Sequence, residues 1–374
     1  MSVLETTQCL VRLASVNPGY DPTSRGEAEM VDWLLAWAHE HGVEVSTQEV
    51  RSGRRNVIMR LRNGAGPHLL LNGHTDTVAI KDMTIPPFGA ELRDGRVWGR
   101  GSADMKGPLA CMLHTLLDLQ KKPADWRGNV TLACVVDEEL GFAGIRHFLE
   151  TEKAFDFAIV GEPTRLEVVR GCKGCLRFFV RAHGKSAHSS TPEQGLSAIS
   201  AMAGAIAVME RFFAESLRAI GHPDLGCSTG SVGLIRGGSG VNIVPEFCEV
   251  KVDVRLVPGQ SWQETYAAIQ RRVENGLPGI RWEFDPQPLA DAPFCLKDAH
   301  PLVRSACVAA GRPESHVVNF SCDASKIAAA GIPCLIFGPG DIAQAHTANE
   351  SIAVEELERG VKAYGKVARA LLKP

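Results

Sequence analysis

The stretch HLLLNGHTDTV, residues 68–78, decides the fold of this chain, because an apolar run ends there in two polar residues, His74 and Asp76. Residues 68–71 are nearly continuous in apolar side chains, as expected for a strand that is covered on both faces. Ligand sites of open α/β sheets lie beyond the carboxyl ends of such strands. A charged side chain at that position also escapes the sheet interior, where an unpaired charge is costly.

Four further segments repeat this arrangement of an apolar run followed by an acid or a histidine. They are GRVWGRGSADMKG (95–107) with Asp104, VTLACVVDEELG (130–141) with Glu138 and Glu139, FDFAIVGEPT (155–164) with Glu162, and CLIFGPGDIAQAHTANE (334–350) with His346. Each alone has an ordinary explanation, since Asp104 could cap the helix that follows it and Glu138 and Glu139 could be solvated. Together the segments offer a set of histidines and carboxylates that suits two zinc-like cations sharing a carboxylate.

The composition argues against several classes of function. The chain has 374 residues and a formal net charge of -3 with no long basic run, so a nucleic-acid partner is not expected. No run approaches the roughly 18 apolar residues of a membrane span, and MSVLETTQCLVRL lacks the layout of a signal peptide. The 11 cysteines are scattered, several of them inside apolar runs. A reducing cytoplasm without a membrane partner is the simplest interpretation.

Two changes of texture predict two domains. Residues 1–173 and 288–374 alternate helical and strand patterns, which predicts a three-layer α/β domain with a mixed sheet. Residues 174–287 predict a strand, a helix, two strands, a helix and a strand. They lie at 176–182, 195–215, 231–235, 247–256, 260–275 and 280–284. That order is typical of a ferredoxin-like α+β unit, which is inserted into the first domain.

Motifs in a fixed order carry a resemblance to a known family. They are GHTDTV, GRGSADMKG, DEELG, GEPT, HGKSAHSS, GGSGVN, DVR and GPGDIAQAHTANE. The pattern resembles the di-zinc deacylases and exopeptidases that include acetylornithine deacetylase, succinyl-diaminopimelate desuccinylase, aminoacylase and glutamate carboxypeptidase. The resemblance implies a catalytic metal-binding domain at 1–173 and 288–374. Residues 174–287 would be a lid domain through which the chain forms a homodimer.

The resemblance also implies a role for each candidate residue. His74 and Glu162 would bind one metal ion, Glu139 and His346 the other, and Asp104 would bridge the two. The peptide bond after Asp104 matches a position that is cis in the family. The ions would be Zn²⁺, for which Co²⁺ or Mn²⁺ could substitute. Asp76, on the same side of the chain as His74, would orient its ring. Glu138 would be the general base.

Three residues of the inserted domain match positions that contact the substrate in the family. His188 matches a histidine that reaches the active site of the partner subunit and holds the carbonyl oxygen. Arg255 matches a clamp for a substrate carboxylate, which suits the planar fork of arginine. Asn242 would add a polar contact. Ordinary surface or turn positions are the alternative explanation for all three.

These features predict a metal-dependent hydrolase of the amide bond of N-acyl amino acids, of the deacetylase or desuccinylase type, in amino-acid metabolism. A dipeptidase or a glutamate carboxypeptidase of the same family is the alternative, since the chemistry is identical and only the pocket differs. A binding homologue without turnover is a further alternative. The complete set of ligand residue types and Glu138 argue against it.

Overall fold

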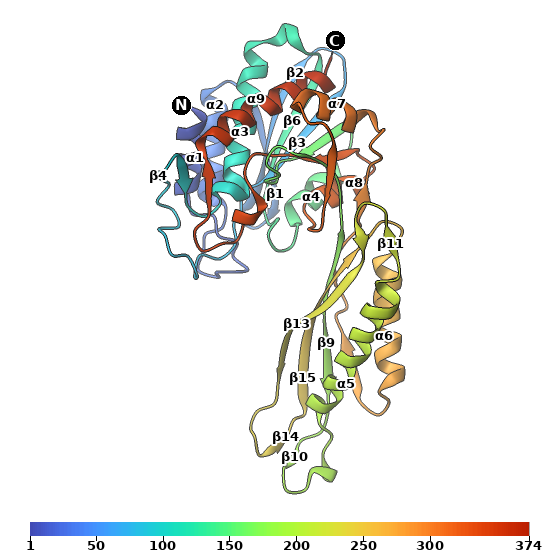
Figure 1. The fold of residues 1–374 in the computed structure, drawn as a ribbon. Helices are drawn as coiled ribbons and strands as arrows, with labels where there is room; N and C mark the ends of the chain where they lie inside the picture. The colour runs from blue at the N-terminus through green and yellow to red at the C-terminus, as the bar shows by residue number, and fades with distance from the viewer. Residues whose placement is uncertain (374) are drawn as a thin grey trace. The chain divides into compact units, whose positions relative to one another are not determined.

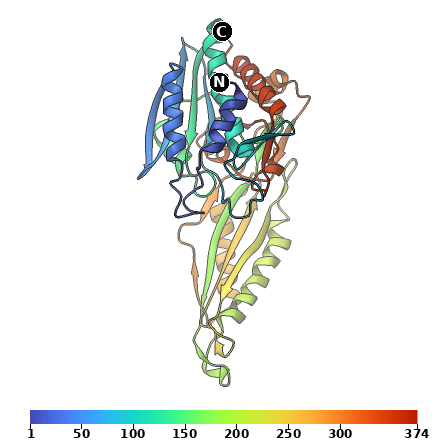
Figure 2. The ribbon, with the colours of Figure 1, turned by 90° about the vertical axis from the view of Figure 1, so that its left-hand side faces the viewer.

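The computed structural model describes residues 1–373 and divides them into two units. The first unit comprises Met1–Gly171, Leu296–His316 and the residues from Cys322 onward, and the second comprises Cys172–Cys295 and Val317–Ser321. Both units are drawn in Figures 1 and 2, where the yellow segments belong to the second unit.

A mixed sheet runs through the first unit. Its strands follow the order β1, β2, β6, β3, β7, β20 and β8. They are β1 Glu44–Arg51, β2 Arg54–Asn63, β6 Gly128–Val135, β3 His68–His74, β7 Phe157–Val160, β20 Cys334–Ile336 and β8 Val168–Cys172. β3 is parallel to β6 and to β7, and β7 is parallel to β20. The carboxyl ends of these four strands therefore meet at one edge of the sheet.

Helices cover both faces of this sheet, as expected for a three-layer fold. Leu69 and Leu71 of β3 point to one face and Leu70 to the other, and all three are buried. The face of Leu69 and Leu71 packs against the helices α1 Val3–Arg12, α2 Ala28–Glu40, α3 Gly107–Lys121, α7 Pro301–Ala310 and α9 Val354–Leu371. Two further helices contact the same sheet but do not belong to this apolar cluster. They are α4 Ala143–Thr151, which packs on β1, β2 and β6, and α8 Ala324–Ala329, which packs on β7 and β20. The predicted α/β class is confirmed.

The second unit is an antiparallel sheet with two helices on one face. Its strands follow the order β13 Thr229–Gly237, β15 Phe247–Leu256, β9 Gly174–His183 and β16 Arg281–Phe284, and β17 Leu289–Asp291 also pairs with β9. The helices α5 Ala198–Arg211 and α6 Trp262–Gly276 bury the alternating apolar residues of β9 and β15. The chain order is β-α-β-β-α-β, the ferredoxin-like pattern.

The boundaries between the two units differ in detail from those that the sequence predicted, between residues 173 and 174 and between residues 287 and 288. β17 begins after residue 287 but pairs with β9, so this part of the chain groups with the second unit. The helix expected at 195–215 begins at Ala198, because the side chain of Ser197 accepts a hydrogen bond from the amide of Ser200 and caps it.

Short elements complete the fold. A small sheet joins β21 Ser351–Ala353, β5 Arg96–Trp98 and β4 Glu91–Arg93. In the second unit β10 Ala187–His188 pairs with β14 Ile243–Val244, and β11 Gly221–His222 with β12 Gly226–Cys227. β18 Phe294–Cys295 and β19 Ser315–Val318 lie at the edge of the main sheet beside β8. None of the helices described is both long and apolar enough to span a bilayer.

Candidate metal centre

The parallel strands of the main sheet deliver most of the candidate ligands to one edge. β3 ends at His74, Glu138 and Glu139 follow β6, Glu162 follows β7, and His346 follows β20 after a loop. Asp104 arrives from the turn Ser102–Lys106, which leads into α3. The peptide bond between Asp104 and Met105 is cis, as the resemblance implied. Segments that are far apart in the sequence thus converge because the strands share a direction.

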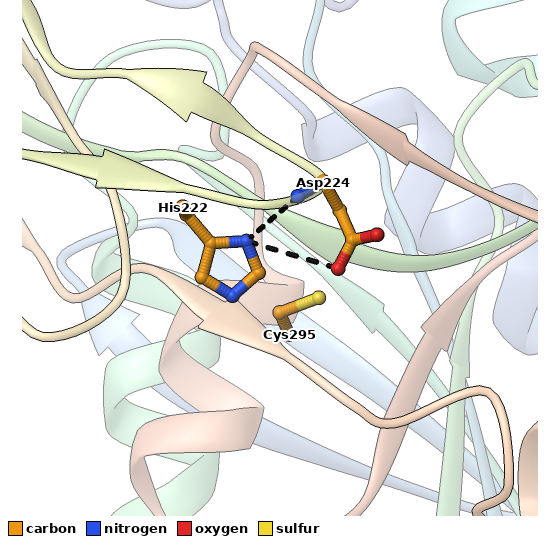
Figure 3. A group of neighbouring side chains, drawn as sticks. All are labelled: His222, Asp224 and Cys295. Atoms are coloured by element: carbon orange, nitrogen blue, oxygen red, sulfur yellow. Dashed lines mark hydrogen bonds and ion pairs between the residues drawn. The ribbon is translucent and has the colours of Figure 1, made fainter.

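Three groups of side chains among the described residues have the composition of metal ligands. One lies in the second unit and consists of His222, Asp224 and Cys295 (Figure 3). The Nδ1 atom of His222 already accepts hydrogen bonds from the backbone amides of Asp224, at 3.2 Å, and Leu225, at 3.4 Å. The turn itself therefore accounts for the position of this ring.

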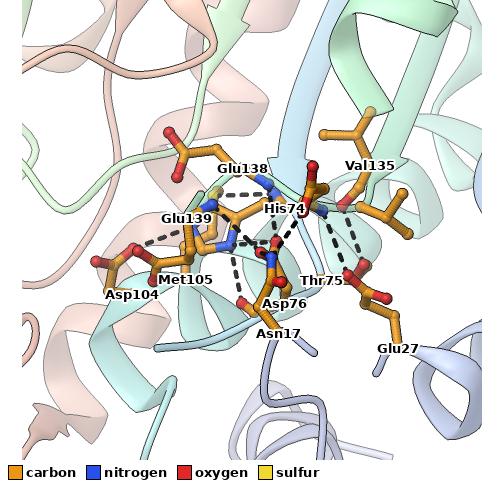
Figure 4. Close-up of polar contacts among 12 residues, drawn as sticks. Asn17, Glu27, His74, Thr75, Asp76, Asp104, Met105, Val135, Glu138 and Glu139 are labelled. Atoms are coloured by element: carbon orange, nitrogen blue, oxygen red, sulfur yellow. Dashed lines mark hydrogen bonds and ion pairs between the residues drawn. The ribbon is translucent and has the colours of Figure 1, made fainter. Parts of the chain in front are cut away.

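The other two groups share His74, which is 1% exposed and lies at the centre of Figure 4. Its Nε2 atom lies 3.0 Å from Oδ1 of Asp104. The second oxygen of Asp104, Oδ2, lies 3.4 Å from Nε2 of His346, and that nitrogen lies 3.0 Å from Oε2 of Glu139. Asp104 therefore presents one oxygen to each histidine, an arrangement that would allow one carboxylate to be shared by two cations.

Two more carboxylates complete the cluster. A ring nitrogen of His74 and one carboxylate oxygen each of Glu138 and Glu162 lie within 4.8 Å of one another. Oε1 of Glu162 and Oε1 of Glu139 are buried without a hydrogen-bond partner among the described residues. A buried carboxylate oxygen without a partner is costly, and a bound cation removes that cost. The donor set of imidazole and carboxylate groups is the set that Zn²⁺ accepts, so the residues present fit a metal pair.

The pKa values of these groups reflect the crowding of negative charge. Burial, and then the neighbouring Glu162, raise the pKa of Glu138 well above its usual range. Burial and Asp104 do the same to the pKa of Glu162. Burial opposes the protonated form of His74, but the hydrogen bond to Asp104 and the nearby glutamates raise its pKa well above the usual value. Hydrogen bonds to Asp104 and Glu139 raise the pKa of His346 to about 10. Metal binding at such a cluster releases protons.

Asp76 contacts His74 differently from the expectation that its carboxylate orients the ring. Nδ1 of His74 lies 3.0 Å from the backbone carbonyl oxygen of Asp76, and 3.6 Å from Oδ1 of its carboxylate. The carboxylate accepts hydrogen bonds from the backbone amides of Glu138, at 3.0 Å, and Glu139, at 3.2 Å. Asp76 therefore fixes the histidine through its main chain and the turn that carries both glutamates through its side chain.

A buried polar network lies behind Asp76. The amide nitrogen Nδ2 of Asn17 donates to Oδ2 of Asp76, at 2.7 Å, and to Oδ1 of Asp137, at 2.9 Å. Arg54 donates to the same oxygen of Asp137, at 3.0 Å, and pairs with the buried Glu27. Asn17 thus separates two carboxylates that are 0% and 2% exposed. Through Asp76, this network fixes the turn that carries Glu138 and Glu139.

Sequence reasoning did not find the supporting residues of the centre. Asp323, at the start of α8, is 1% exposed, and its charge contributes to raising the pKa of Glu138 and Glu162. Glu350 is 0% exposed and binds the loop that carries Asp104. Asn17 lies in the segment SVNPGYDP, which has the composition of an ordinary loop. The available signal was a polar side chain inside or next to a site motif, as with Glu350 in HTANE.

The three predicted substrate residues of the second unit lie at the two ends of its sheet. His188 and Asn242 are neighbours, because the amide of Ser189 donates to the carbonyl of Asn242 at 3.0 Å. Arg255 lies near the other end of β15, and its Nε donates to Oδ1 of Asp253 at 2.7 Å. Arg255 and Phe247, near the two ends of β15, pair with residues of β9 that are eight positions apart, which corresponds to about 26 Å along the strand. One unit therefore cannot bring His188 and Arg255 to the same small substrate.

Comparison with known proteins identifies the family. The model of peptidase family M20/M25/M40 matches residues 70–370. The chain belongs to this family. An acetylornithine deacetylase of Vibrio parahaemolyticus is 31% identical over 97% of this chain and 97% of its own length. This M20 family member is accordingly a hydrolase that acts on amide bonds.

Solved structures share the fold of this M20 family member. The M20 family metallo-carboxypeptidase Sso-CP2 of Sulfolobus solfataricus matches with a TM-score of 0.83 and 20% identity, over 99% of both chains. The YXEP protein of Bacillus subtilis, described as a dinuclear metal binding peptidase, matches with a TM-score of 0.74 and 17% identity, over 99% of this chain and 98% of that chain. At these identities the likeness shows the fold alone.

The Asn17 bridge generates a stability prediction for this M20 family member. Asn17→Ala leaves Asp76 and Asp137 buried without their shared donor, so it should lower the free energy of unfolding by at least about 1–3 kcal/mol. Asn17→Asp keeps the shape but adds a third carboxylate, and should cost more. Urea unfolding of the metal-free protein measures both, with the exposed Asn275→Ala as control. If all three variants unfold alike, the bridge contributes nothing.

Proposed function

We propose that this chain is a metal-dependent hydrolase that removes the acyl group from N-acyl amino acids with the help of two divalent cations. The observation that carries the proposal is Asp104, whose two oxygens face His74 and His346 separately, at 3.0 and 3.4 Å. The acetylornithine deacetylases that are about 30% identical over nearly the whole chain support this substrate class.

The proposed ligands divide into two sets around Asp104. His74 and Glu162 would hold one ion, and Glu139 and His346 the other, with Asp104 shared. The proximity of Glu162 to His74 and the 3.0 Å contact between His346 and Glu139 support this division. Zn²⁺ is the proposed ion, with Co²⁺ or Mn²⁺ as substitutes, because two imidazoles and three carboxylates suit borderline cations.

Glu138 is the proposed general base. When bound, the two cations supply an activated water near neutral pH and polarise the amide carbonyl. Glu138 has no ligand duty in this scheme, and its carboxylate would accept the proton of the attacking water and then donate it to the leaving nitrogen. The hydrogen bond from its backbone amide to Asp76 keeps the carboxylate on a fixed turn. At 8% exposure, Glu138 is shielded from bulk water.

The proposed substrate contacts come from the second unit, which would act as a lid. Arg255 would bind the carboxylate of the amino acid through its planar fork, exchanging its present partner Asp253 for the substrate. Asn242 would add a polar contact. His188, which is exposed and lies at the far end of the lid sheet from Arg255, would hold the carbonyl oxygen in the partner's active site.

A homodimer through the lid is part of the proposal. β13 is the edge strand of the lid sheet, and its residues Leu234 and Ile235 are 49% and 55% exposed. An unpaired edge with exposed apolar side chains is a template for pairing with a second copy. A two-fold contact of this kind would bring each His188 toward the other chain.

The cytoplasm is the proposed location. Cys111 and Cys134 are buried in the core of the first unit, and burial raises the pKa of both thiols. Such thiols are inert core residues of the kind that a reducing compartment preserves.

Two adjacent glutamates test the mechanism. Glu138→Gln should keep two bound ions per chain but lower kcat by about 10²–10⁴-fold, because only the base is lost. Glu139→Gln should lose the ion that it shares with His346. Elemental analysis gives the stoichiometry. Turnover is measured with N-acetyl, N-succinyl and N-formyl amino acids and with dipeptides.

The substrate panel separates the alternatives. Cleavage of N-acyl amino acids in preference to dipeptides supports the proposal, and the reverse order assigns a dipeptidase. Wild-type protein that binds ions but cleaves none of these substrates contradicts the proposed activity. A Glu138→Gln variant with near wild-type turnover removes Glu138 from the mechanism.

A mixing experiment tests the role of His188. His188→Ala and Glu138→Ala should each be inactive alone. Co-refolding them in equal amounts should give about half mixed dimers, each with one complete site, and so about a quarter of wild-type activity by symmetry counting. Absence of recovery, with subunit exchange shown by mass spectrometry, would place His188 outside the partner's site.

A further inference from the structure

A buried carboxylate outside the proposed ligand set binds the loop that carries Asp104. Glu350 is 0% exposed. Its Oε1 accepts hydrogen bonds from the backbone amides of Ala103, at 2.9 Å, and Asp104, at 3.0 Å. Its Oε2 accepts from Nη1 of Arg100, at 2.8 Å, and from the amide of Gly101, at 3.1 Å. All of these donors belong to residues 100–104, the segment that ends at Asp104.

Glu350 also ties this loop to the segment of His346. It lies four residues after His346 in the sequence, and its own carbonyl accepts a hydrogen bond from the amide of Gly99 at 3.0 Å. The amide of Thr84 holds the same segment through the carbonyl of Ala348, at 2.8 Å. The segments of Asp104 and His346, which are distant in the sequence, are thereby fixed against each other through one side chain.

The loop has little freedom to take up another conformation. Gly101 has a φ of 81°, a region that favours glycine, and a Cβ atom there would lie 2.9 Å from side-chain atoms of Lys106 and Thr77. Arg100 is 4% exposed and donates a second hydrogen bond to the carbonyl of Ala79. Loss of the Glu350 contacts would therefore leave several buried donors without an acceptor.

We propose that Glu350 is a positioning residue for the metal pair. Its carboxylate fixes the backbone of residues 100–104 so that the two oxygens of Asp104 face His74 and His346. Glu350 is not itself a ligand, because both of its oxygens are already engaged by the loop. This inference rests on the proposed function, in which Asp104 is a ligand of both ions. Partners that orient metal ligands typically change metal affinity by about 10–100-fold.

The test is the metal affinity of Glu350→Gln. The substitution keeps the shape but turns one acceptor into an NH₂ group that faces two donors of the loop. Affinity for Zn²⁺, measured on the full chain by competition with a chromophoric chelator, should fall by about 10–100-fold at both sites, because both use Asp104. The kcat should fall with it at limiting metal, whereas KM should change little. Glu350→Asp retains the charge and retracts it by one methylene, so it should show a smaller loss.

A matched control separates positioning from general stability. Asp118 pairs with Arg369 between α3 and α9, about 16 Å along α3 from its first residue, Gly107. Asp118→Asn should lower thermal stability and leave Zn²⁺ affinity unchanged.

Three outcomes overturn the inference. The first is a wild-type affinity for Zn²⁺ in Glu350→Gln. If that variant does not fold, a wild-type affinity in Glu350→Asp takes its place. The last is a loss of Zn²⁺ affinity in Asp118→Asn that equals the loss in the Glu350 variants. Wild-type protein that binds no divalent ion overturns the proposed function as well.

Discussion

The crowding of carboxylates at one edge of the main sheet is the constraint on which the catalytic unit depends. Asp104, Glu138, Glu139 and Glu162 gather around His74, and all of them are largely removed from water. Several buried like charges cannot stay ionised together without positive charge nearby. The raised pKa values of His74 and His346 reflect this demand for positive charge. A pair of cations would meet the demand in place of those protons, and the parallel strands that place the acids there also make the site accessible at the strand ends.

Hydrogen bonding divides the buried carboxylates of this unit into two kinds. Asp76 and Glu350 are surrounded by N–H donors, so they hold backbone in place. Glu139 and Glu162 each keep a buried oxygen without a partner among the described residues, so they have capacity left for a cation. Buried carboxylates thus serve two different purposes in this unit.

The sequence predicted the elements whose signal is local. The apolar run before His74 and the runs before Glu138 and Glu162 are strands, because continuous apolar stretches are typical of sheets covered on both faces. β1 was not predicted, because it is an exposed edge strand with little alternation of apolar and polar residues. Asn17 could not be predicted, since its importance comes from two acceptors that are distant in the chain. For Glu350 the only signal was its place beside the His346 motif, because its donors are also distant in the chain. The role of Asp76 was predicted only in part. Its carboxylate accepts hydrogen bonds from the backbone amides of Glu138 and Glu139, and no spacing in the sequence reveals these contacts.

The bridging of two ions by Asp104 is the central claim, and anomalous diffraction from crystals grown with Zn²⁺ tests it most directly. Data collected at the zinc edge should show two peaks about 3.5–4 Å apart, one on each side of the Asp104 carboxylate. One peak should lie between His74 and Glu162 and the other between Glu139 and His346. A single peak, or a second ion that Asp104 does not touch, would contradict the account.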